Sequence, residues 1–423
     1  MIKFLTRYNP QLFLGFLVLM FISLPLSRFG LSVAQFGLLG VWLIDGKLMT
    51  KFRTLFKNKA ALVLISFYLV HVIGLMYTTD LNYAFKDLRI KLPLLFLPVV
   101  FVTSPQLSMK RVNQLLMIYV ASVFVATLIS FGILLTRTIS DFRELSPFIS
   151  HIRFSLNVCI AMFFTGYLMV FELKSKISLK LLAGAVIIWF FVFLIMIESV
   201  TGIIIFFITG SILMLGFIVR MKIFYCKLIG LIVLISIPVI LAIYLNITAK
   251  NYFIPREKSN PELFTRQGNP YYHDTINQPI ENGMYTWMYV CEMELREMWN
   301  NKSKLDYDGK DTQGQDLKYT LIRYLNSKGL RKDAGGMKQL SEKDIKNIEL
   351  GIANYHYTRK FNVNSRLYKL FWEYQISKMK GNPGGHSMLQ RIEFWRASWA
   401  IILDNFWIGV GTGDIDQAYK IYY

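Results

Sequence analysis

Hydrophobic residues form nine long runs in the first 245 residues, and short polar stretches separate them. A bilayer span needs about 20 apolar residues, and its backbone polar groups must bond within the segment, so each run predicts a helix. The second run is short and the eighth follows the seventh closely, so each of these two is either a span or a re-entrant segment. The runs cover about residues 11–27, 31–45, 60–77, 88–103, 112–135, 154–171, 179–197, 200–219 and 223–245.

The polar segment 246–390 predicts a separate α-helical domain between the spans and the end of the chain. Gly329 is placed to end one of its helices, and Ser341 with Asp344 three residues later forms the capping box of another. The helices are predicted at about 281–300, 316–330, 341–351 and 365–380.

Residues 391–423 predict an interfacial helix followed by a Gly-rich turn. Arg391, Trp395, Trp399 and Ile402 recur at helical spacing on one face. The apolar part of this helix is too short to cross a bilayer. We therefore expect it to lie at the membrane surface, with its tryptophans at headgroup level.

Composition and charge fit a polytopic membrane protein, with 54% hydrophobic and 17% charged residues. The net charge is +20, and residues 1–245 hold 22 Lys and Arg against 7 Asp and Glu. The loops 46–59 and 220–227 are basic and contain no acid. With the N-terminus cytoplasmic, these loops fall inside and the segment 246–390 falls outside. Nucleic acid is not an expected partner, because no basic helix or stacking platform accompanies the charge.

No metal or cofactor site is predicted from the motifs. The three cysteines are scattered, and the histidines lack the spacing of metal ligands. The GVGTGD sequence at 409–414 lacks the Lys-Ser/Thr pair of a phosphate-binding P-loop. The DYDGKD sequence at 306–311 lacks the closing Glu of a calcium loop. Both sequences are more typical of turns.

Positive charges at the outer ends of predicted spans oppose the insertion bias, so something must compensate them. Arg89 and Lys91 open the fourth run, and Arg153 lies in the sequence HIRFS at the start of the sixth. One interpretation pairs these cations with nearby acids such as Asp87. The other interpretation is a cationic site for phosphate groups.

His386, Arg391 and Arg396 are the candidate catalytic group. A histidine suits general-base catalysis near neutral pH, and an arginine can bind a diphosphate through two parallel hydrogen bonds. Transfer from a lipid diphosphate needs both functions. The structural alternative is a salt bridge to Glu393 with His386 as a helix cap.

The chain resembles the O-antigen ligase and O-antigen polymerase superfamily of bacterial membrane glycosyltransferases. The resemblance rests on the Arg391-x-x-x-Trp395 pattern, on the run NFWIGVGTG at 405–413, and on many spans with one large outer loop late in the chain. HIRFS at 151–155 and SVTG at 199–202 resemble two further family segments at outer span ends.

The resemblance implies a glycosyltransferase C-type helical fold and a glycan donor on undecaprenyl diphosphate, used without metal or nucleotide at the outer face of the bacterial inner membrane. Arg391 matches a diphosphate-binding arginine of the family. Val200 stands where members often carry Arg, so we expect Arg153 to replace that charge. The family's catalytic His usually follows the GVG run, and the sequence ends at Tyr423 before such a motif and before the closing spans. A longer native chain is therefore expected, and His386 is the candidate base here.

The acceptor and even the class of function remain open at this stage. The resemblance allows a ligase acting on lipid A core, a polysaccharide polymerase or a protein O-oligosaccharyltransferase. A transporter or flippase for lipid-linked glycans, or an inactive assembly subunit, are the rivals. Mid-span charges would favour a transporter, but His71 is the only strongly mid-span titratable residue, which favours surface chemistry.

Overall fold

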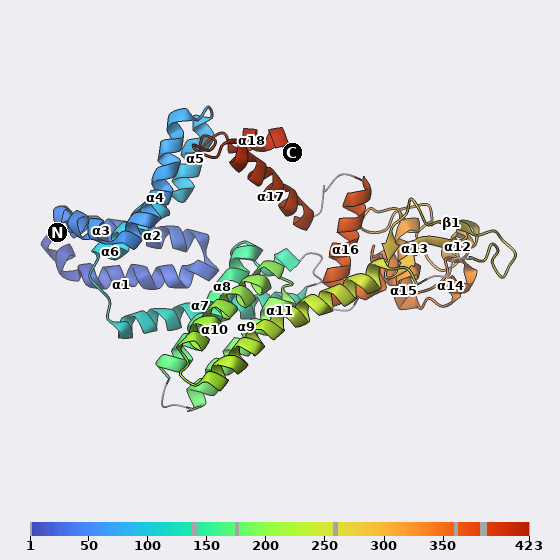
Figure 1. The fold of residues 1–423 in the computed structure, drawn as a ribbon, viewed down its shortest axis with the longest axis horizontal. Helices are drawn as coiled ribbons and strands as arrows, with labels where there is room; N and C mark the ends of the chain where they lie inside the picture. Colours follow the sequence, from blue (N-terminus) through green and yellow to red (C-terminus); the bar gives the residue numbers. More distant parts are fainter. Residues whose placement is uncertain are drawn as a thin grey trace. The chain divides into compact units, whose positions relative to one another are not determined.

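Helices make up most of the chain (Figure 1). The computed structural model describes residues 2–137, 142–173, 177–256, 261–358, 363–380 and 387–422. Two compact units emerge, one formed by Met1–Leu213 with Phe394–Tyr423 and the other by Met214–Glu393.

Six helices in the described ranges are long and apolar enough to cross a membrane, and a bent pair would make a seventh span. The predicted number was nine. The six are α4 with its 3-10 extension (Lys59–Tyr77), α7 (Met109–Thr136), α8 (His151–Phe171), α9 (Ile177–Met196), α10 (Val200–Arg220) and α11 (Phe224–Phe253). The eighth predicted run is therefore a full-length helix, α10, and not a short re-entrant segment.

The first predicted run agrees with the apolar part of α1 (Ile2–Leu26), which is Pro10–Leu26 and is shorter than the six helices above. The second and fourth runs differ from the prediction. The helix α2 (Arg28–Ile44) turns by 116° into α3 (Leu48–Lys57), because Gly46 and Lys47 both adopt positive φ angles between them.

A break at Leu92 divides the fourth run into α5 (Leu81–Lys91) and α6 (Pro93–Thr103). Pro93 has no amide hydrogen to donate to the carbonyl of Arg89, so the helical ladder is interrupted there. At about 1.5 Å per residue, α6 alone rises only about 16 Å. This is about half of the hydrocarbon core.

Two large apolar clusters and a small one around Leu55, Ala61 and Ile65 lie among the described residues of the first unit. The cluster between α1, α2, α6 and α7 is centred on buried residues such as Leu17, Leu38 and Val100. The other large cluster joins α7, α8 and α9 around Val123, Phe154 and others. A short 3-10 turn (Phe142–Leu145) precedes α8.

The second unit contains short strands where helix was predicted, so the expectation of a purely α-helical domain is wrong. β2 (Ile280–Glu281) and β3 (Met284–Tyr285) form a hairpin, and β1 (Tyr272–Asp274) pairs antiparallel with β4 (Trp287–Val290). Only α12 (Glu292–Asn300) keeps the predicted helix at 281–300. Asn282 and Gly283, with φ of 57° and 74°, form the two-residue turn that the Asn-Gly pair favours.

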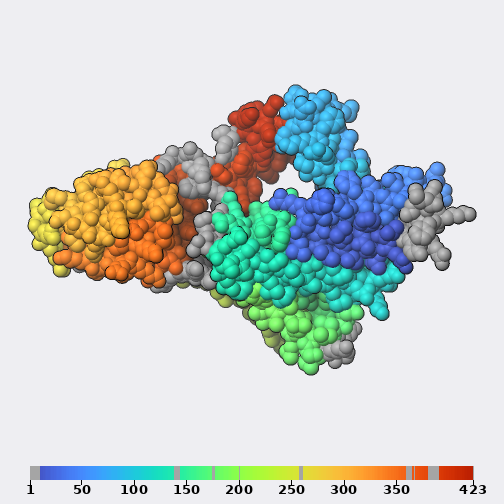
Figure 2. All heavy atoms as spheres, turned by 180° about the vertical axis from the view of Figure 1, so that it is seen from behind, coloured from blue at the N-terminus to red at the C-terminus, as the bar shows by residue number. Residues whose placement is uncertain are grey.

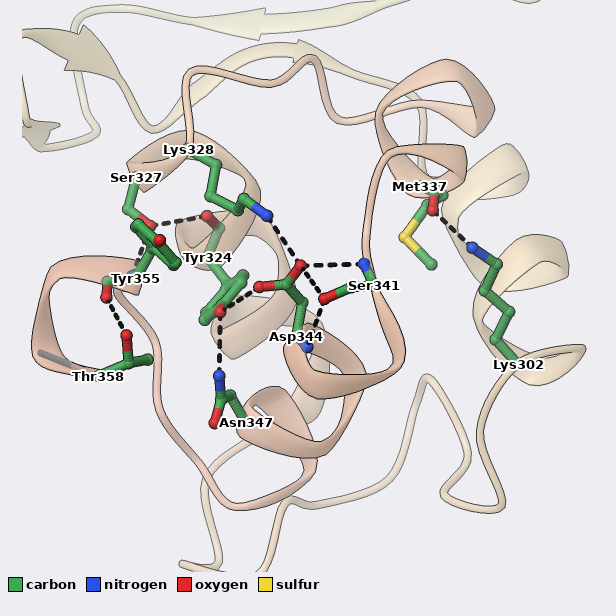
Figure 3. A network of polar contacts seen from close by, with 10 residues as sticks. All are labelled: Lys302, Tyr324, Ser327, Lys328, Met337, Ser341, Asp344, Asn347, Tyr355 and Thr358. Carbon is green, nitrogen blue, oxygen red and sulfur yellow. Dashed lines mark hydrogen bonds and ion pairs between the residues drawn. The ribbon is translucent and has the colours of Figure 1, made fainter.

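The other predicted helices of the second unit are confirmed, with small changes in their ends. They are α13 (Leu317–Ser327), α15 (Glu342–Glu349) and α16 (Val363–Lys380), accompanied by the short α14 (Ala334–Lys338) and a 3-10 turn (Tyr355–Thr358). Gly329 takes a positive φ after α13, and Ser341 forms the predicted capping box with Asp344. Figure 3 shows that Asp344 also binds Tyr324 of α13 and Lys328 directly after it, which joins the two helices.

The C-terminal segment returns to the first unit. It contains α17 (Ser387–Asp404), the Gly-rich turn and α18 (Ile415–Tyr422). The end of α18 folds back on α17, because Tyr419 bonds Ser398 and packs edge-on against Phe394.

Candidate functional site

The predicted interfacial face is present on α17. Trp395 and Trp399 are 71% and 64% exposed, and Arg391 is exposed on the same face. The opposite face buries Ala397 and Ile401. An exposed face of one cation and large aromatic rings suits a helix that lies at a bilayer surface.

Two of the candidate catalytic residues, Arg391 and Arg396, do not share one face of α17. Arg396 follows Arg391 by five residues, which places it roughly 140° further around the helix. Arg391 falls at the edge of the second unit, and Arg396 belongs to the first. His386 lies outside the described residues.

The Gly-rich turn after α17 docks on the C-terminal end of α4 and the start of α5. The Asp414 carboxylate accepts hydrogen bonds from the Thr79 amide (2.9 Å), the Thr79 hydroxyl (2.6 Å) and the Asp80 amide (3.0 Å). In Figure 2 the C-terminal segment, in red, lies against the light-blue residues of this region. The bonds from the Thr79 hydroxyl and amide lower the pKa of Asp414, so its carboxylate is charged at neutral pH.

Further hydrogen bonds tie the rest of the turn to the same place. Gly413 donates its amide to the Thr78 hydroxyl at 2.8 Å, and Thr412 donates its hydroxyl to the His71 carbonyl at 2.7 Å. The hydroxyl of Tyr77 donates to the carbonyl of Ile408 at 2.7 Å. The turn is therefore held from both sides by residues more than 330 positions earlier in the chain.

Two glycines of the turn are required by this close approach. A Cβ on Gly413 would lie 1.9 Å from the Asp80 carbonyl oxygen, and one on Gly411 would lie 2.6 Å from the Thr78 Cα. Both distances are far below van der Waals contact, and the obstacles are backbone atoms that have no room to move. The glycines therefore serve the docking of the turn.

Four amides of the turn already have acceptors, and that of Gly409 donates to the Asn405 carbonyl. The amide of Thr412 donates to the Gly74 carbonyl, that of Gly413 to Thr78, and that of Asp414 to the Gly411 carbonyl. A phosphate-binding loop must instead present free amides to its ligand. The geometry thus favours the interpretation of GVGTGD as a structural turn.

The starts of α8 and α10 form a second location of interest, because the two family-like segments HIRFS and SVTG pack together there. A Cβ on Gly202 would lie only 2.8 Å from the Ser155 Cβ, and the Cys159 thiol donates to the Gly202 carbonyl at 3.2 Å. The Gly202 amide donates to the Ser199 hydroxyl at 3.2 Å. Two segments that are more than 40 residues apart therefore form one packed corner.

Arg153 and Arg89 are exposed, and their guanidinium groups have no hydrogen-bond or ion-pair partner among the described residues. Lys91, by contrast, pairs with Asp87 at 2.6 Å, as the salt-bridge interpretation predicted. The structure does not bring Arg89 and Arg153 together, since α5 packs on α4 and α6 whereas α8 packs on α7 and α9.

Sequence reasoning missed two features of these locations. The first is the partnership of Asp414 with Thr79, for which a single sequence carries no signal. The second is Glu198, which precedes the SVTG segment and adopts a positive φ of 50°. Glu198 is the only acidic residue in the sequence between Glu172 and Glu257. This isolation in an apolar region is a signal by which the sequence could have identified Glu198 as a candidate functional residue.

No group of three or more His, Cys, Asp or Glu side chains is placed to hold a metal ion in the ranges that the structure describes. His71 lies in α4 with its Nδ1 atom 2.7 Å from the Phe67 carbonyl oxygen, a contact within its own helix.

A scan of protein-family models finds no family that matches this chain. Searches of curated proteins and of solved structures find no match either. The resemblance to the O-antigen ligase superfamily therefore stays a prediction from the motifs.

Proposed function

We propose that this chain is a membrane glycosyltransferase that transfers a glycan from undecaprenyl diphosphate to an acceptor hydroxyl at the outer face of the bacterial inner membrane. The observation that carries the proposal is the docking of the Gly-rich turn on the end of α4. This contact fixes the end of α17 relative to the membrane-spanning part of the first unit.

The charges of the loops predict on which side of the membrane this contact lies. The start of α4 follows the basic loop 46–59, which the positive-inside rule places in the cytoplasm. The docked turn contacts the other end of α4, so it lies on the extracytoplasmic side. The diphosphate of a lipid-linked glycan and the exposed tryptophans of α17 would then both lie at the headgroup level of the outer leaflet.

The corner between α8 and α10 falls on that side by the same argument. The α10 helix ends at Arg220, where the basic loop 220–227 begins, so its start lies at the opposite side of the membrane. Arg153 lies two residues before Ser155, which packs on Gly202. This position supports the proposal that Arg153 supplies the charge expected at Val200.

Arg89 is proposed to lie within the outer half of the bilayer. The chain must return to the cytoplasmic side between α4 and α7, and α6 is too short to cross alone. The last turns of α5 then enter the membrane, carrying Arg89 without a protein partner in the described ranges. A cation at that depth needs an anionic partner, and a lipid diphosphate provides one.

The proposed reaction divides the work between arginines and a base. The acceptor oxygen forms a bond to the anomeric carbon of the glycan while the bond from that carbon to the diphosphate breaks. The base takes the acceptor proton, and we assign this role to His386. Arg391, the match to the family's arginine, is proposed to stabilise the negative charge that gathers on the departing diphosphate. Arg396 lies on another face of α17, and the structure does not bring Arg89 and Arg153 together, so these three are proposed only as separate cations that attract the phosphates of lipid-linked donors.

Substitution of single arginines in cells tests the proposal. We expect Arg391→Ala and Arg153→Ala to cause lipid-linked glycan to accumulate, with at least tenfold less transferred product. Arg220→Ala, which removes a cation at the opposite end of α10, is the matched control and should leave transfer unchanged. Normal transfer by both arginine variants at normal protein levels would reject the proposal.

A lipid transporter is the second candidate, because the 116° bend between α2 and α3 resembles the interrupted helices of transporters. Purified protein in vesicles distinguishes the two functions. A transporter would move labelled undecaprenyl-diphosphate glycan between leaflets without an acceptor, whereas a transferase would consume the donor only when an acceptor is added.

A further inference from the structure

A charged pocket lies at the end of the first unit opposite to the docked turn, where α2 bends into α3 and where α6 connects to α7. Lys51 is only 6% exposed there, and its Nζ atom bonds the Trp42 carbonyl at 2.7 Å and pairs with Asp45 at 3.1 Å. The indole of Trp42 donates to the Thr103 hydroxyl at 2.6 Å, which joins α2 to α6. These bonds make the pocket a fixed part of the fold.

The pocket has an excess of positive charge. Lys51 is neutralised by Asp45, but Arg111 at the start of α7 also lines the pocket, and its guanidinium group has no partner among the described residues. The pocket measures about 120 Å³, well above the roughly 10 to 15 Å³ that holds a single water. It therefore offers space and one uncompensated guanidinium group to a compact anion.

An apolar groove begins where the pocket ends. The groove measures about 530 Å³ and shares Phe13 and the loop 104–107 with the pocket. It continues between α1, α6 and α7, where Leu17, Phe101 and Leu116 line it. A cationic pocket that opens into an apolar groove matches a molecule with an anionic head and a hydrocarbon tail.

The neighbouring helix α3 indicates the depth of the pocket in the membrane. Met49, Phe52 and Phe56 are exposed on one face of α3, and Arg53 and Lys57 occupy the face beside it. This division is typical of a helix that lies in the headgroup region with its apolar face toward the acyl chains. The basic loops place this end of the unit at the cytoplasmic leaflet.

We propose that this pocket and groove bind one anionic phospholipid of the cytoplasmic leaflet. Its phosphate pairs with Arg111 beside Lys51, and an acyl chain fills the groove between α1, α6 and α7. The site is separate from the proposed transferase site, which lies at the other end of α4. Binding would stabilise the junction of the α2–α3 bend with α6.

Lipid binding to the purified full chain in detergent tests the proposal. We expect added phosphatidylglycerol to raise the Tm and to appear as a one-to-one complex in native mass spectrometry, whereas phosphatidylcholine and inorganic phosphate should do neither. Arg111→Gln should weaken phosphatidylglycerol binding about fivefold, as expected for one cation at an anionic lipid surface.

Two further variants separate the site from general surface charge. Lys110→Gln removes the adjacent exposed cation, which does not line the pocket, and should leave the one-to-one complex intact. Phe101→Ala shortens the wall of the groove and should weaken lipid binding without creating phosphate binding. Equal losses for Lys110→Gln and Arg111→Gln, or equal stabilisation by inorganic phosphate, would overturn the proposal.

Discussion

The carboxylate of Asp414 accepts hydrogen bonds from both the amide and the hydroxyl of Thr79, a residue 335 positions earlier in the chain. The contact joins the two separate stretches of sequence that make up the first unit, Met1–Leu213 and Phe394–Tyr423. It also explains why a Gly-rich turn with no phosphate-binding features is present. Its strength can be measured directly.

Replacement of Asp414 by alanine should lower the Tm of the purified chain by a few degrees. The variant leaves the amides of Thr79 and Asp80 without their acceptor, which destabilises the docked turn. Asp416→Ala is the matched control, since Asp416 is exposed on α18 and makes none of these bonds. Identical Tm values for the two variants would show that the turn is not held by Asp414.

The hairpin of β2 and β3 should tolerate alanine poorly at Gly283. This glycine has a φ of 74°, and a Cβ there would lie 2.9 Å from the Asn251 carbonyl oxygen and 3.1 Å from that of Ile254. The left-handed backbone and the crowding together should cost about 2 to 4 kcal/mol, measured by urea unfolding.

Gly268→Ala separates these two causes. Gly268 has a similar φ of 84°, but a Cβ there would meet nothing within 4 Å. We expect a cost of about 1 to 2 kcal/mol, due to the backbone conformation alone. If Gly268→Ala proved as harmful as Gly283→Ala, the contact with the end of α11 would contribute nothing.

The network around Asp344 should make the second unit sensitive to acid. Burial acts to raise the pKa of Asp344, but bonds from Lys328, Tyr324 and Ser341 outweigh it and bring the pKa to about 2, below the ordinary 3.8. A lowered pKa in the folded state stabilises the protein fully at pH values above the ordinary pKa. That stabilisation, roughly 1 to 2 kcal/mol, should disappear as the pH falls from about 4 to about 2.

Unfolding measured between pH 6 and pH 2 checks this expectation. Asp344→Asn should be less stable than the natural chain at pH 6 and should approach it at pH 2. A constant difference across the range would mean that the charge of Asp344 makes no contribution. Asp274→Asn is a suitable control, because that half-buried residue at the end of β1 accepts hydrogen bonds only from the nearby amides of Ile276 and Asn277.

Local signals in the sequence predicted a good part of the fold. Ser341 with Asp344 predicted the start of α15, and the spacing of Trp395 and Trp399 predicted the exposed face of α17. These features depend on neighbours within a few residues. The Asn282-Gly283 pair carried an equally local signal, but the aromatic and Met-rich sequence around it suggested a helix instead.

Other features depend on contacts between distant residues, which a single sequence does not reveal. The bonds between Thr79 and Asp414 and the packing of Ser155 on Gly202 are of this kind. For the candidate site, the sequence identified Arg89 and Arg153 as notable cations but gave no information on their separation. Hydropathy also did not show where an apolar run is interrupted, as at the bend of Gly46 and Lys47 after the second run and at Leu92 within the fourth.

The length of α11 has a mechanical consequence for the second unit. The helix has 30 residues, and its apolar part at 224–245 rises about 33 Å, enough to cross the hydrocarbon core. The remaining residues, 246–253, project about 12 Å further. Gly283 of the hairpin turn bonds Tyr252 at the end of this projection, and Phe371 of α16 packs on the Tyr252 ring.

The projecting end of α11 therefore acts as a rigid helical spacer. Its length sets the distance between the apolar part of α11 and the polar domain. Each residue inserted between 246 and 253 would shift the domain by about 1.5 Å along the axis of α11 and rotate it by about 100° around that axis. The number of residues in the projecting end of α11 thus determines where the polar domain can bind other molecules, in addition to the side chains on the domain's own surface.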